Sequence, residues 1–392
     1  MPLWSLFLGI SKTRKGYIIK RMEKEAMKIG ILTFHRVYNY GAVLQAYSLQ
    51  KTLDDLGMDN EIIDFSTIKQ RDFLSLYSVH NGLKRFFKTI LLLPFHQERK
   101  RRIEQFDDFI NHTMKLSTKT YQNEEELAET NYLYHTFVSG SDQIWNITKK
   151  ADSSDGYFLA FADENKKRIS YATSIGTATY EQLLNKKALL GKYQMISCRE
   201  LDGAATLGRI TGKNVPVVLD PTLLVDPIHF LSLITTINCC PYLLYYSLDG
   251  YNQKNSNIDI LKALSQKFNL KVLFITPEWP RHSFGQEIIS AGPEEFISLI
   301  ANAALVCTNS FHGTALSIKM NRPFYVLEKM DIRDTRKRSL LEQLGLTNRI
   351  ISNSYEIDDV GDYSIDYEPI NKKLEVLRLR SFNYIKEAVN FK

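Results

Sequence analysis

Residues 303–327 hold the sequence pattern that most constrains the fold of this chain. An apolar run at 303–307 predicts a short buried strand, and a polar segment at 308–313 follows it. Apolar residues then recur at helical spacing until 321–323, where Asn-Arg-Pro predicts the end of a helix, and 324–327 predicts a second strand. Strand, turn, helix and strand in this order favour a parallel α/β sheet, because parallel strands need a crossover connection.

The same alternation recurs along the whole chain. Strand patterns at 28–34 and 61–65 flank an amphipathic helix pattern at 42–56, which predicts one strand–helix–strand unit. Further strands are predicted at 136–139, 167–174, 195–198, 215–219, 242–246 and 271–275, with helices at 199–207, 257–268, 293–301 and near 339–344. Two successive series of alternating elements predict an α/β fold of two doubly wound, Rossmann-like domains that face a cleft.

The pattern also predicts domain boundaries. We expect an N-terminal domain at 28–195, with a polar, helical insertion at 66–130, and a C-terminal domain at 196–364. A helix in 365–392 is expected to pack back toward the first domain. Residues 1–27 are apolar and then basic, and the first strand pattern starts abruptly after them, so we expect a disordered extension or a mis-called start there.

Composition and charge limit the classes of protein to which the chain can belong. With 392 residues, 44% of them hydrophobic and 24% charged, the chain has the make-up of a globular protein of two domains. The formal net charge is +6, but residues 1–27 supply +4 of it. The remaining +2 is too small a charge to indicate nucleic-acid binding. No uncharged apolar run reaches the ~18 residues of a membrane span, so at most peripheral membrane contact is expected.

The cysteine and histidine patterns predict neither a disulfide framework nor a metal site. Cys198, Cys239, Cys240 and Cys307 lie in apolar segments without C-x-x-C spacing, which favours a reducing cytoplasm. The histidines lack the paired spacing of metal ligands, and the chain holds no glycine-rich dinucleotide or P-loop signature. No metal and no cofactor are therefore predicted.

Polar clusters follow the apolar strands at their carboxyl ends. They are Tyr38–Gly41, Gly140–Asn146, Arg199-Glu200 and Ser310–Gly313. The carboxyl ends of parallel strands collect on one edge of a sheet, where ligands bind, so we expect these clusters to converge at the cleft. Each cluster alone is also a good turn or an exposed helix start. Their common position is what favours a site.

His312 and Gly313 occupy the predicted start of the helix in the 303–327 segment. A helix start exposes unpaired N–H groups and a partial positive charge, which suit a phosphate or carboxylate group. The alternative is structural: Asn309 or Ser310 would be an ordinary N-cap, and His312 would pack against its neighbours.

The order of these motifs resembles the polysaccharide pyruvyl transferase family. The matching pieces are Asn39–Gly41, Gly140–Asn146, Ser170–Ala172, Ile196–Glu200, Asp220–Leu224, and Ser310–Gly313 with Arg322-Pro323. The resemblance spans about residues 28–350 and implies a two-domain fold like that of the GT-B glycosyltransferases. It implies a transferase, cytoplasmic or at the inner face of the membrane, that moves a pyruvyl group from phosphoenolpyruvate to a saccharide, free or lipid-linked. The product would be a ketal in an exopolysaccharide or cell-surface glycan.

The resemblance also implies roles for single residues. Arg199 and His312 match positions that bind the phosphoenolpyruvate anion, and His312 at a helix start is also a candidate proton donor. Asp142 is a candidate general base by residue type, with a turn or N-cap carboxylate as the alternative. Trp145 and Asn146 are candidates for a sugar platform, with a core tryptophan as the alternative. The other candidate substrate-binding residues are Asn39, Tyr40, Gly41, Ser141, Ser310 and Gly313.

One position departs from the family pattern. Many family members carry Arg two residues before the motif His, where this chain has Ser310. Loss of that cation removes a charge-assisted contact of ~1.5–3 kcal/mol to a bound dianion. Lys319, Arg322, Arg333 and the run 336–338 are candidates to replace it.

Two other functions stay open at this point. A GT-B-type glycosyltransferase that uses a nucleotide sugar would have the same fold, because fold does not specify chemistry. A non-catalytic glycan-binding or assembly subunit is the other alternative, and an anion site weakened at Ser310 would favour it.

Overall fold

The structure is a computed structural model that describes residues 28–67, 70, 92–148, 154–237, 240–248, 256–275, 284–327, 335–357 and 360–390. The expectation for residues 1–27 lies outside the described residues, as do most of 68–91 within the insertion and Arg333. Within the described ranges, no helix combines the length and the apolar composition of a membrane span.

The first half of the chain forms a parallel four-stranded sheet in the order β2-β1-β3-β4. Its strands are β1 (Ile29–Leu32), β2 (Asn60–Ile62), β3 (Thr136–Ser139) and β4 (Lys167–Ser170). The strands predicted at 195–198 and 215–219 form only isolated parallel bridges, such as Thr173 to Cys198 and Cys198 to Val217. Pro216, which has no backbone N–H to donate, interrupts the second of them.

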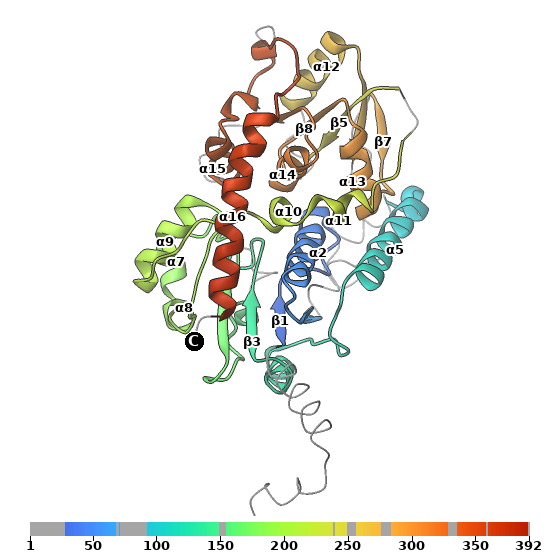
Figure 1. Cartoon of the computed structure of the whole chain (residues 1–392). Helices are drawn as coiled ribbons and strands as arrows, with labels where there is room; N and C mark the ends of the chain where they lie inside the picture. Colours follow the sequence, from blue (N-terminus) through green and yellow to red (C-terminus); the bar gives the residue numbers. More distant parts are fainter. Residues whose placement is uncertain are drawn as a thin grey trace, which may run out of the picture.

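Helices surround this sheet (Figure 1). They are α2 (Tyr40–Asp55), α5 (His96–Thr113), α6 (Glu124–Ala128), α7 (Tyr180–Leu184), α8 (Lys187–Gly191) and α9 (Leu201–Thr211). Helix α2 connects β1 to β2 and buries Val43, Leu44 and Leu49, which the helical spacing of apolar residues predicts. Helix α5 belongs to the predicted insertion.

The second half forms a parallel six-stranded sheet in the order β10-β9-β8-β5-β6-β7. Its strands are β5 (Tyr242–Tyr246), β6 (Lys271–Ile275), β7 (Gln286–Ile288), β8 (Leu305–Thr308), β9 (Phe324–Leu327) and β10 (Ile350–Ile351). Its helices are α12 (Ser256–Phe268), α13 (Pro293–Asn302), α14 (Phe311–Lys319) and α15 (Thr335–Leu344). The chain thus folds into two parallel-sheet α/β domains.

Three further helices join the two domains. The short helices α10 (Pro221–Leu224) and α11 (Pro227–Leu231) lead from the first sheet to the second. Helix α16 (Glu368–Asn390) runs along both domains (Figure 1). Near its C-terminal end the Tyr384 hydroxyl donates to Ser170 O at 2.7 Å, and near its N-terminal end Lys373 Nζ donates to Leu344 O at 3.2 Å.

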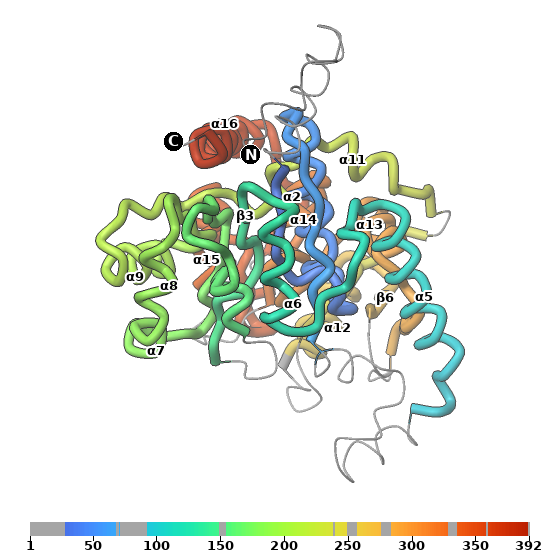
Figure 2. The backbone as a smooth tube through the Cα atoms, turned by 90° about the horizontal axis from the view of Figure 1, so that it is seen from below, coloured from blue at the N-terminus to red at the C-terminus, as the bar shows by residue number. Residues whose placement is uncertain are grey.

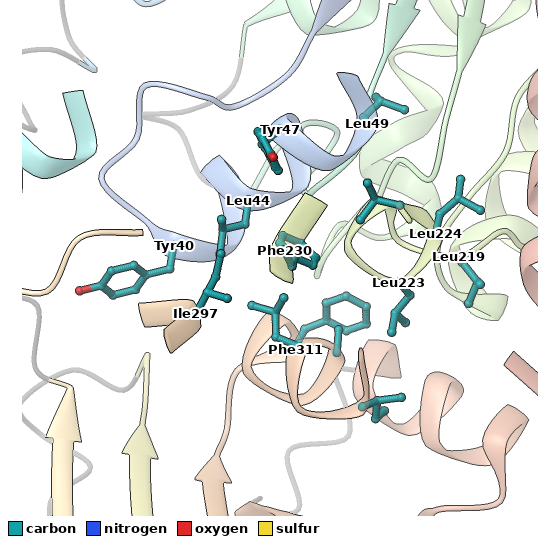
Figure 3. Close-up of a cluster of buried hydrophobic side chains, with 14 of the residues drawn as sticks. Tyr40, Leu44, Tyr47, Leu49, Leu219, Leu223, Leu224, Phe230, Ile297 and Phe311 are labelled. Carbon is teal, nitrogen blue, oxygen red and sulfur yellow. The ribbon is translucent and has the colours of Figure 1, made fainter. Parts of the chain in front are cut away.

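An apolar contact joins the domains beside these helices. Tyr40 at the start of α2 stacks on Phe296 of α13, with ring centroids 4.3 Å apart. Figure 3 shows further side chains of α2 facing Ile297 of α13 and Phe311 of α14, with Phe230 and Leu223 between them. Seen from below, α13 also lies beside α5 (Figure 2). This contact brings the N-terminal ends of α2 and α14 together.

Truncation of Phe296 tests this contact. Phe296 is fully buried, so Phe296→Ala should lower the free energy of unfolding by about 3–5 kcal/mol through lost burial and a residual cavity. The measurement is urea denaturation followed by fluorescence. Leu379→Ala on α16 is the control, because Leu379 is 60% exposed and its truncation should cost no more than about 0.5 kcal/mol. Equal losses in the two variants would contradict the structure.

Candidate active site

Four ionisable side chains meet where the two domains join. Asp142 lies in the loop after β3, and Arg199 lies just before α9. Asp220 begins α10, and His312 is in the first turn of α14. All four are nearly buried, with exposed fractions from 1% for Asp220 to 9% for Asp142. Charged groups this deep are kept only when they are paired or bind a ligand.

Arg199 is the centre of the cluster. Its Nη1 lies 2.6 Å from Asp220 Oδ2 and 3.4 Å from His312 Nε2, and its Nη2 lies 3.5 Å from Asp142 Oδ1. Burial lowers the pKa of Arg199, but the carboxylates of Asp220 and Asp142 outweigh burial, so that pKa lies above its usual value. The guanidinium therefore keeps its charge. Its face also lies over the Phe311 ring, with Cζ 4.2 Å from the ring centroid.

Asp220 contacts both Arg199 and His312. Its Oδ1 accepts from the backbone N–H of Thr222 at 2.9 Å and from the Thr222 hydroxyl at 2.7 Å, as an N-cap of α10. Its Oδ2 is then left for Arg199 and for His312, whose Nε2 is 3.4 Å away. Burial raises the pKa of Asp220, but the positive charges of His312 and Arg199 outweigh burial and hold that pKa well below its usual range.

Sequence reasoning gave Asp220 no role. Asp-Pro-Thr at 220–222 is an N-cap followed by Pro in the first helical turn. That local pattern accounts for the hydrogen bonds of one Asp220 carboxylate oxygen. The position of the other oxygen depends on two residues distant in sequence, which no local pattern reveals.

The loop that carries Asp142 is fixed from several sides. Asp142 has a left-handed backbone, with φ of 66°, a conformation that Asp tolerates better than most residues. Its carbonyl accepts from Ser174 N at 2.9 Å. Ser141 is fully buried, its hydroxyl donates to Ala172 O at 2.8 Å, and its N–H donates to Gln45 Oε1 at 3.2 Å. Ser141 therefore positions the loop, and Asp142 is the member of the loop that reaches Arg199.

Asp142 is ionised in this environment. Burial raises the pKa of its carboxyl, but the positive charges of His312, Arg199 and Arg336 outweigh burial and lower it. An ionised carboxylate can accept a proton from a hydroxyl group placed beside it.

Gly41 of α2 lies directly against His312 of α14. A Cβ atom on Gly41 would lie 2.1 Å from His312 Nδ1, so no other residue fits there without displacing the imidazole. The starts of α2 and α14 thus meet at Gly41 and His312. The polar clusters predicted both helix starts.

Asn39, Ser310 and Gly313 shape the helix starts. Asn39 accepts from Ala42 N at 3.1 Å, and Ser310 Oγ accepts from Gly313 N at 3.4 Å, so both are N-caps. A Cβ atom on Gly313 would lie 2.4 Å from the Thr308 hydroxyl. The N-cap alternative for Ser310 is therefore the one that the structure shows.

Three predicted substrate-binding residues lie in packed positions. Trp145 is fully buried, stacks on Phe158 and donates from Nε1 to Tyr157 O at 3.1 Å. The structure thus gives the core tryptophan that was the alternative, and the indole has no open face for a sugar. The Asn146 amide is buried and donates to Gln143 Oε1 at 3.0 Å. Tyr40 is buried between the domains, and its hydroxyl donates to Ala291 O at 2.7 Å.

Of the cations proposed to replace the missing Arg, Arg336 acts on the site. Its positive charge contributes to lowering the pKa of Asp142, and α15, which carries Arg336, contacts α9. Lys319 points elsewhere, because its Nζ donates to Leu223 O at 3.2 Å and to Val225 O. Among the described residues, no three His, Cys, Asp or Glu side chains are grouped so that they could hold a metal ion.

Loss of Asp220 tests the buried pairing. Asp220→Asn leaves Arg199 without its closest countercharge and should lower the free energy of unfolding at neutral pH by about 3–5 kcal/mol. The pKa of Asp220 is lower in the folded protein than in the unfolded chain. The ionised carboxylate therefore stabilises the fold fully above the unfolded pKa of about 3.9, and this stabilisation is lost as the pH falls from there through the folded pKa. The difference between wild type and variant in urea denaturation should therefore shrink in acid.

Asp59→Asn is the matched control for this substitution. Asp59 is exposed, so its replacement should change stability by no more than about 0.5 kcal/mol at either pH. A difference between wild type and Asp220→Asn that does not depend on pH would contradict the pairing.

Comparisons with known proteins bear on the fold and the family of this chain. Two solved structures share the fold at low sequence identity. A putative UDP-N-acetylglucosamine 2-epimerase from Listeria monocytogenes has a TM-score of 0.54 at 11% identity, covering 93% of this chain and 97% of that one. The S. aureus MnaA–UDP co-structure has a TM-score of 0.52 at 12% identity, with the same two coverages, 93% and 97%. These likenesses show a two-domain fold of the GT-B type.

The family comparison covers the residues that build the site. A comparison with curated proteins finds no match. The family model for polysaccharide pyruvyl transferase matches residues 39–328, which include Gly41, Asp142, Arg199, Asp220 and His312. The chain therefore belongs to the polysaccharide pyruvyl transferase family and is a transferase.

Proposed function

We propose that the protein transfers the pyruvyl group of phosphoenolpyruvate to a saccharide as a ketal, with release of phosphate. The observation that carries the proposal is the buried cluster of Arg199, His312 and Asp142 at two helix starts. We place the reaction in the cytoplasm, in the synthesis of an exopolysaccharide or a cell-surface glycan.

Phosphoenolpyruvate carries a phosphate and a carboxylate, and the cluster offers groups that bind both. Arg199 is 4% exposed, and its Nε has no hydrogen-bond partner among the described residues. His312 lies in the first turn of α14, where backbone N–H groups and the helix dipole favour an anion. Cations and helix N–H groups together suit a phosphate better than either alone.

The two carboxylates of the cluster differ in how closely they contact Arg199. Asp220 contacts Arg199 at 2.6 Å and is fixed by Thr222, whereas Asp142 contacts Arg199 at 3.5 Å. An incoming anion would therefore compete with Asp142 and leave the Arg199–Asp220 pair intact. Release from Arg199 would leave the Asp142 carboxylate to accept the proton of a sugar hydroxyl.

Arg336 supports the same site in place of the missing Arg. Ser310 uses its hydroxyl to cap α14, so it brings no charge to the anion. Arg336 brings a positive charge from α15 that lowers the pKa of Asp142. Its neighbour Lys337 connects α15 to the loop before α14, because Lys337 Nζ donates to Asn309 O at 2.9 Å. We propose that Arg336 contributes the second arginine charge to the donor site.

The proposed reaction proceeds through two additions. His312, in its protonated form, gives its proton to the methylene carbon, which becomes the methyl group, and leaves an oxocarbenium-like centre at the adjacent carbon. One sugar hydroxyl adds to that carbon, loses its proton to Asp142, and the carbon–oxygen bond to phosphate breaks. The second hydroxyl then adds to the same carbon and gives its proton to the neutral His312, which closes the ketal and restores the protonated imidazole. Arg199 and the helix starts stabilise the departing phosphate.

Substitutions of the two donor-site cations test this proposal. Arg199→Lys and His312→Gln should remove the thermal stabilisation of the protein by phosphoenolpyruvate, because each loses a contact to the anion. In wild type, donor at 100 times its Kd should add about 2.7 kcal/mol of stability. Arg209→Lys is the matched control, since Arg209 is on α9 and lies over Tyr180, at 4.4 Å from its ring centroid.

The same measurement separates the alternatives. Stabilisation by UDP and none by phosphoenolpyruvate would favour a glycosyltransferase instead. Stabilisation by phosphoenolpyruvate that survives in both site variants would contradict the assignment of Arg199 and His312.

A single methyl group at Gly41 tests the position of His312. Gly41→Ala should lower phosphate release from phosphoenolpyruvate at least ~100-fold, because the new Cβ displaces the proposed proton donor. Gly191→Ala is the control, since its Cβ would meet nothing within 4 Å. Full activity in a folded Gly41→Ala variant would rule out His312 as the proton donor.

A further inference from the structure

A groove of about 750 Å³ lies between α5 of the insertion, α13 and the strands β5 to β7. Leu273 of β6 and Ile288 of β7 line it with partly buried aliphatic side chains. Gln105 of α5 and Glu295 of α13 line it with polar groups. Both views of the backbone place α5 beside α13 (Figures 1 and 2). We call this cavity the α5–α13 groove; its volume is in the range of ligand sites.

Two of the residues that line the groove carry a side-chain oxygen without a hydrogen-bond partner among the described residues. Gln105 Oε1 and Glu295 Oε2 are both buried, and neither has a partner among the described residues. A buried polar atom without a partner costs about 1–3 kcal/mol. Both atoms are acceptors, so a ligand that satisfies them must donate hydrogen bonds.

The charges of the groove decide which donor fits. Two carboxylates, of Glu294 and Glu295, face the groove against one cation, Lys271. This lining disfavours a phosphate or a nucleotide. A sugar donates through its hydroxyl groups and can rest the apolar face of its ring on Leu273 and Ile288. The hydroxyls of Ser298 and Thr235, 3.3 Å apart, add further hydrogen-bonding groups.

The groove is connected to the charged cluster through Tyr40. The Tyr40 ring stacks on Phe296 of α13, and Arg102 of α5 lies over the same ring at 5.3 Å. The next residue, Gly41, abuts His312. Glu295 directly precedes Phe296 on α13, and its negative charge adds to the rise that burial causes in the pKa of Tyr40.

We propose that the α5–α13 groove binds a saccharide, as a subsite for residues of the acceptor glycan beyond the sugar that reacts. The proposal rests on the proposed function, because that function requires an acceptor. The insertion then contributes directly to acceptor binding, since Gln105 of α5 supplies one hydrogen-bond acceptor and Glu295 of α13, in the C-terminal domain, supplies the other.

Nuclear magnetic resonance titration tests the proposal on the full-length protein. The probes are neutral tetrasaccharides of glucose, galactose and mannose, with spermidine and UDP as competing ligand classes. At least one tetrasaccharide should show saturation transfer from wild type. Gln105→Ala and Glu295→Ala should each raise its Kd about tenfold or more, the loss expected from one hydrogen bond to a buried acceptor.

Glu104→Ala is the matched control. Glu104 is the neighbour of Gln105 on α5, its side chain is 58% exposed and it contacts Lys100, so its loss should leave the Kd unchanged. Transfer from none of the tetrasaccharides, an unchanged Kd in both groove variants, or binding of spermidine that the groove variants abolish would each overturn the proposal.

The donor site gives an independent readout. Arg199→Lys should keep tetrasaccharide binding and lose stabilisation by phosphoenolpyruvate. Saccharide binding without any response to phosphoenolpyruvate would therefore contradict the proposed function alone, and the reverse result would contradict the groove alone.

Discussion

The buried contact between Arg199 and Asp220, with His312 beside both, is the interaction on which the site depends. Its members come from the starts of α9, α10 and α14, and they meet at one oxygen of one carboxylate. Charges this deeply buried are tolerated only with excellent pairing, so the contact constrains how the two domains meet. It also holds a guanidinium in its charged form where two helix starts already favour an anion.

Apolar packing makes that electrostatic arrangement possible. Tyr40 and the residues that follow it on α2 pack against α13 and α14 (Figure 3), which brings the helix starts together. Gly41 then lets the backbone of α2 approach the His312 ring, where any side chain would collide. Asp142 completes the balance of charge, with a longer contact that an anion can replace. The proposed function requires a negatively charged ligand to take the place of that longer contact.

The sequence predicted most of the fold and part of the site. Strands with uninterrupted apolar, β-branched or aromatic runs, such as Tyr242–Tyr246 and Phe324–Leu327, have the predicted bounds. The edge strands Gln286–Ile288 and Ile350–Ile351 are too short to give a pattern. Asp142, Arg199 and His312 were predicted to lie together because each follows a strand, and the carboxyl ends of parallel strands lie on one edge of a sheet. The role of Asp220 and the core position of Trp145 depend on which direction each side chain takes, and single-sequence patterns carry no such information.

The most direct measurement of the central claim follows the new carbon–hydrogen bond. The protein is incubated in heavy water with phosphoenolpyruvate and the glycan of the producing cell, and the products are examined by proton and phosphorus nuclear magnetic resonance. We expect a pyruvyl ketal whose methyl group carries one deuterium, with an equal amount of inorganic phosphate. Phosphoenolpyruvate and glycan that both stay unchanged, or a ketal whose methyl group carries no deuterium, would contradict the proposed transfer.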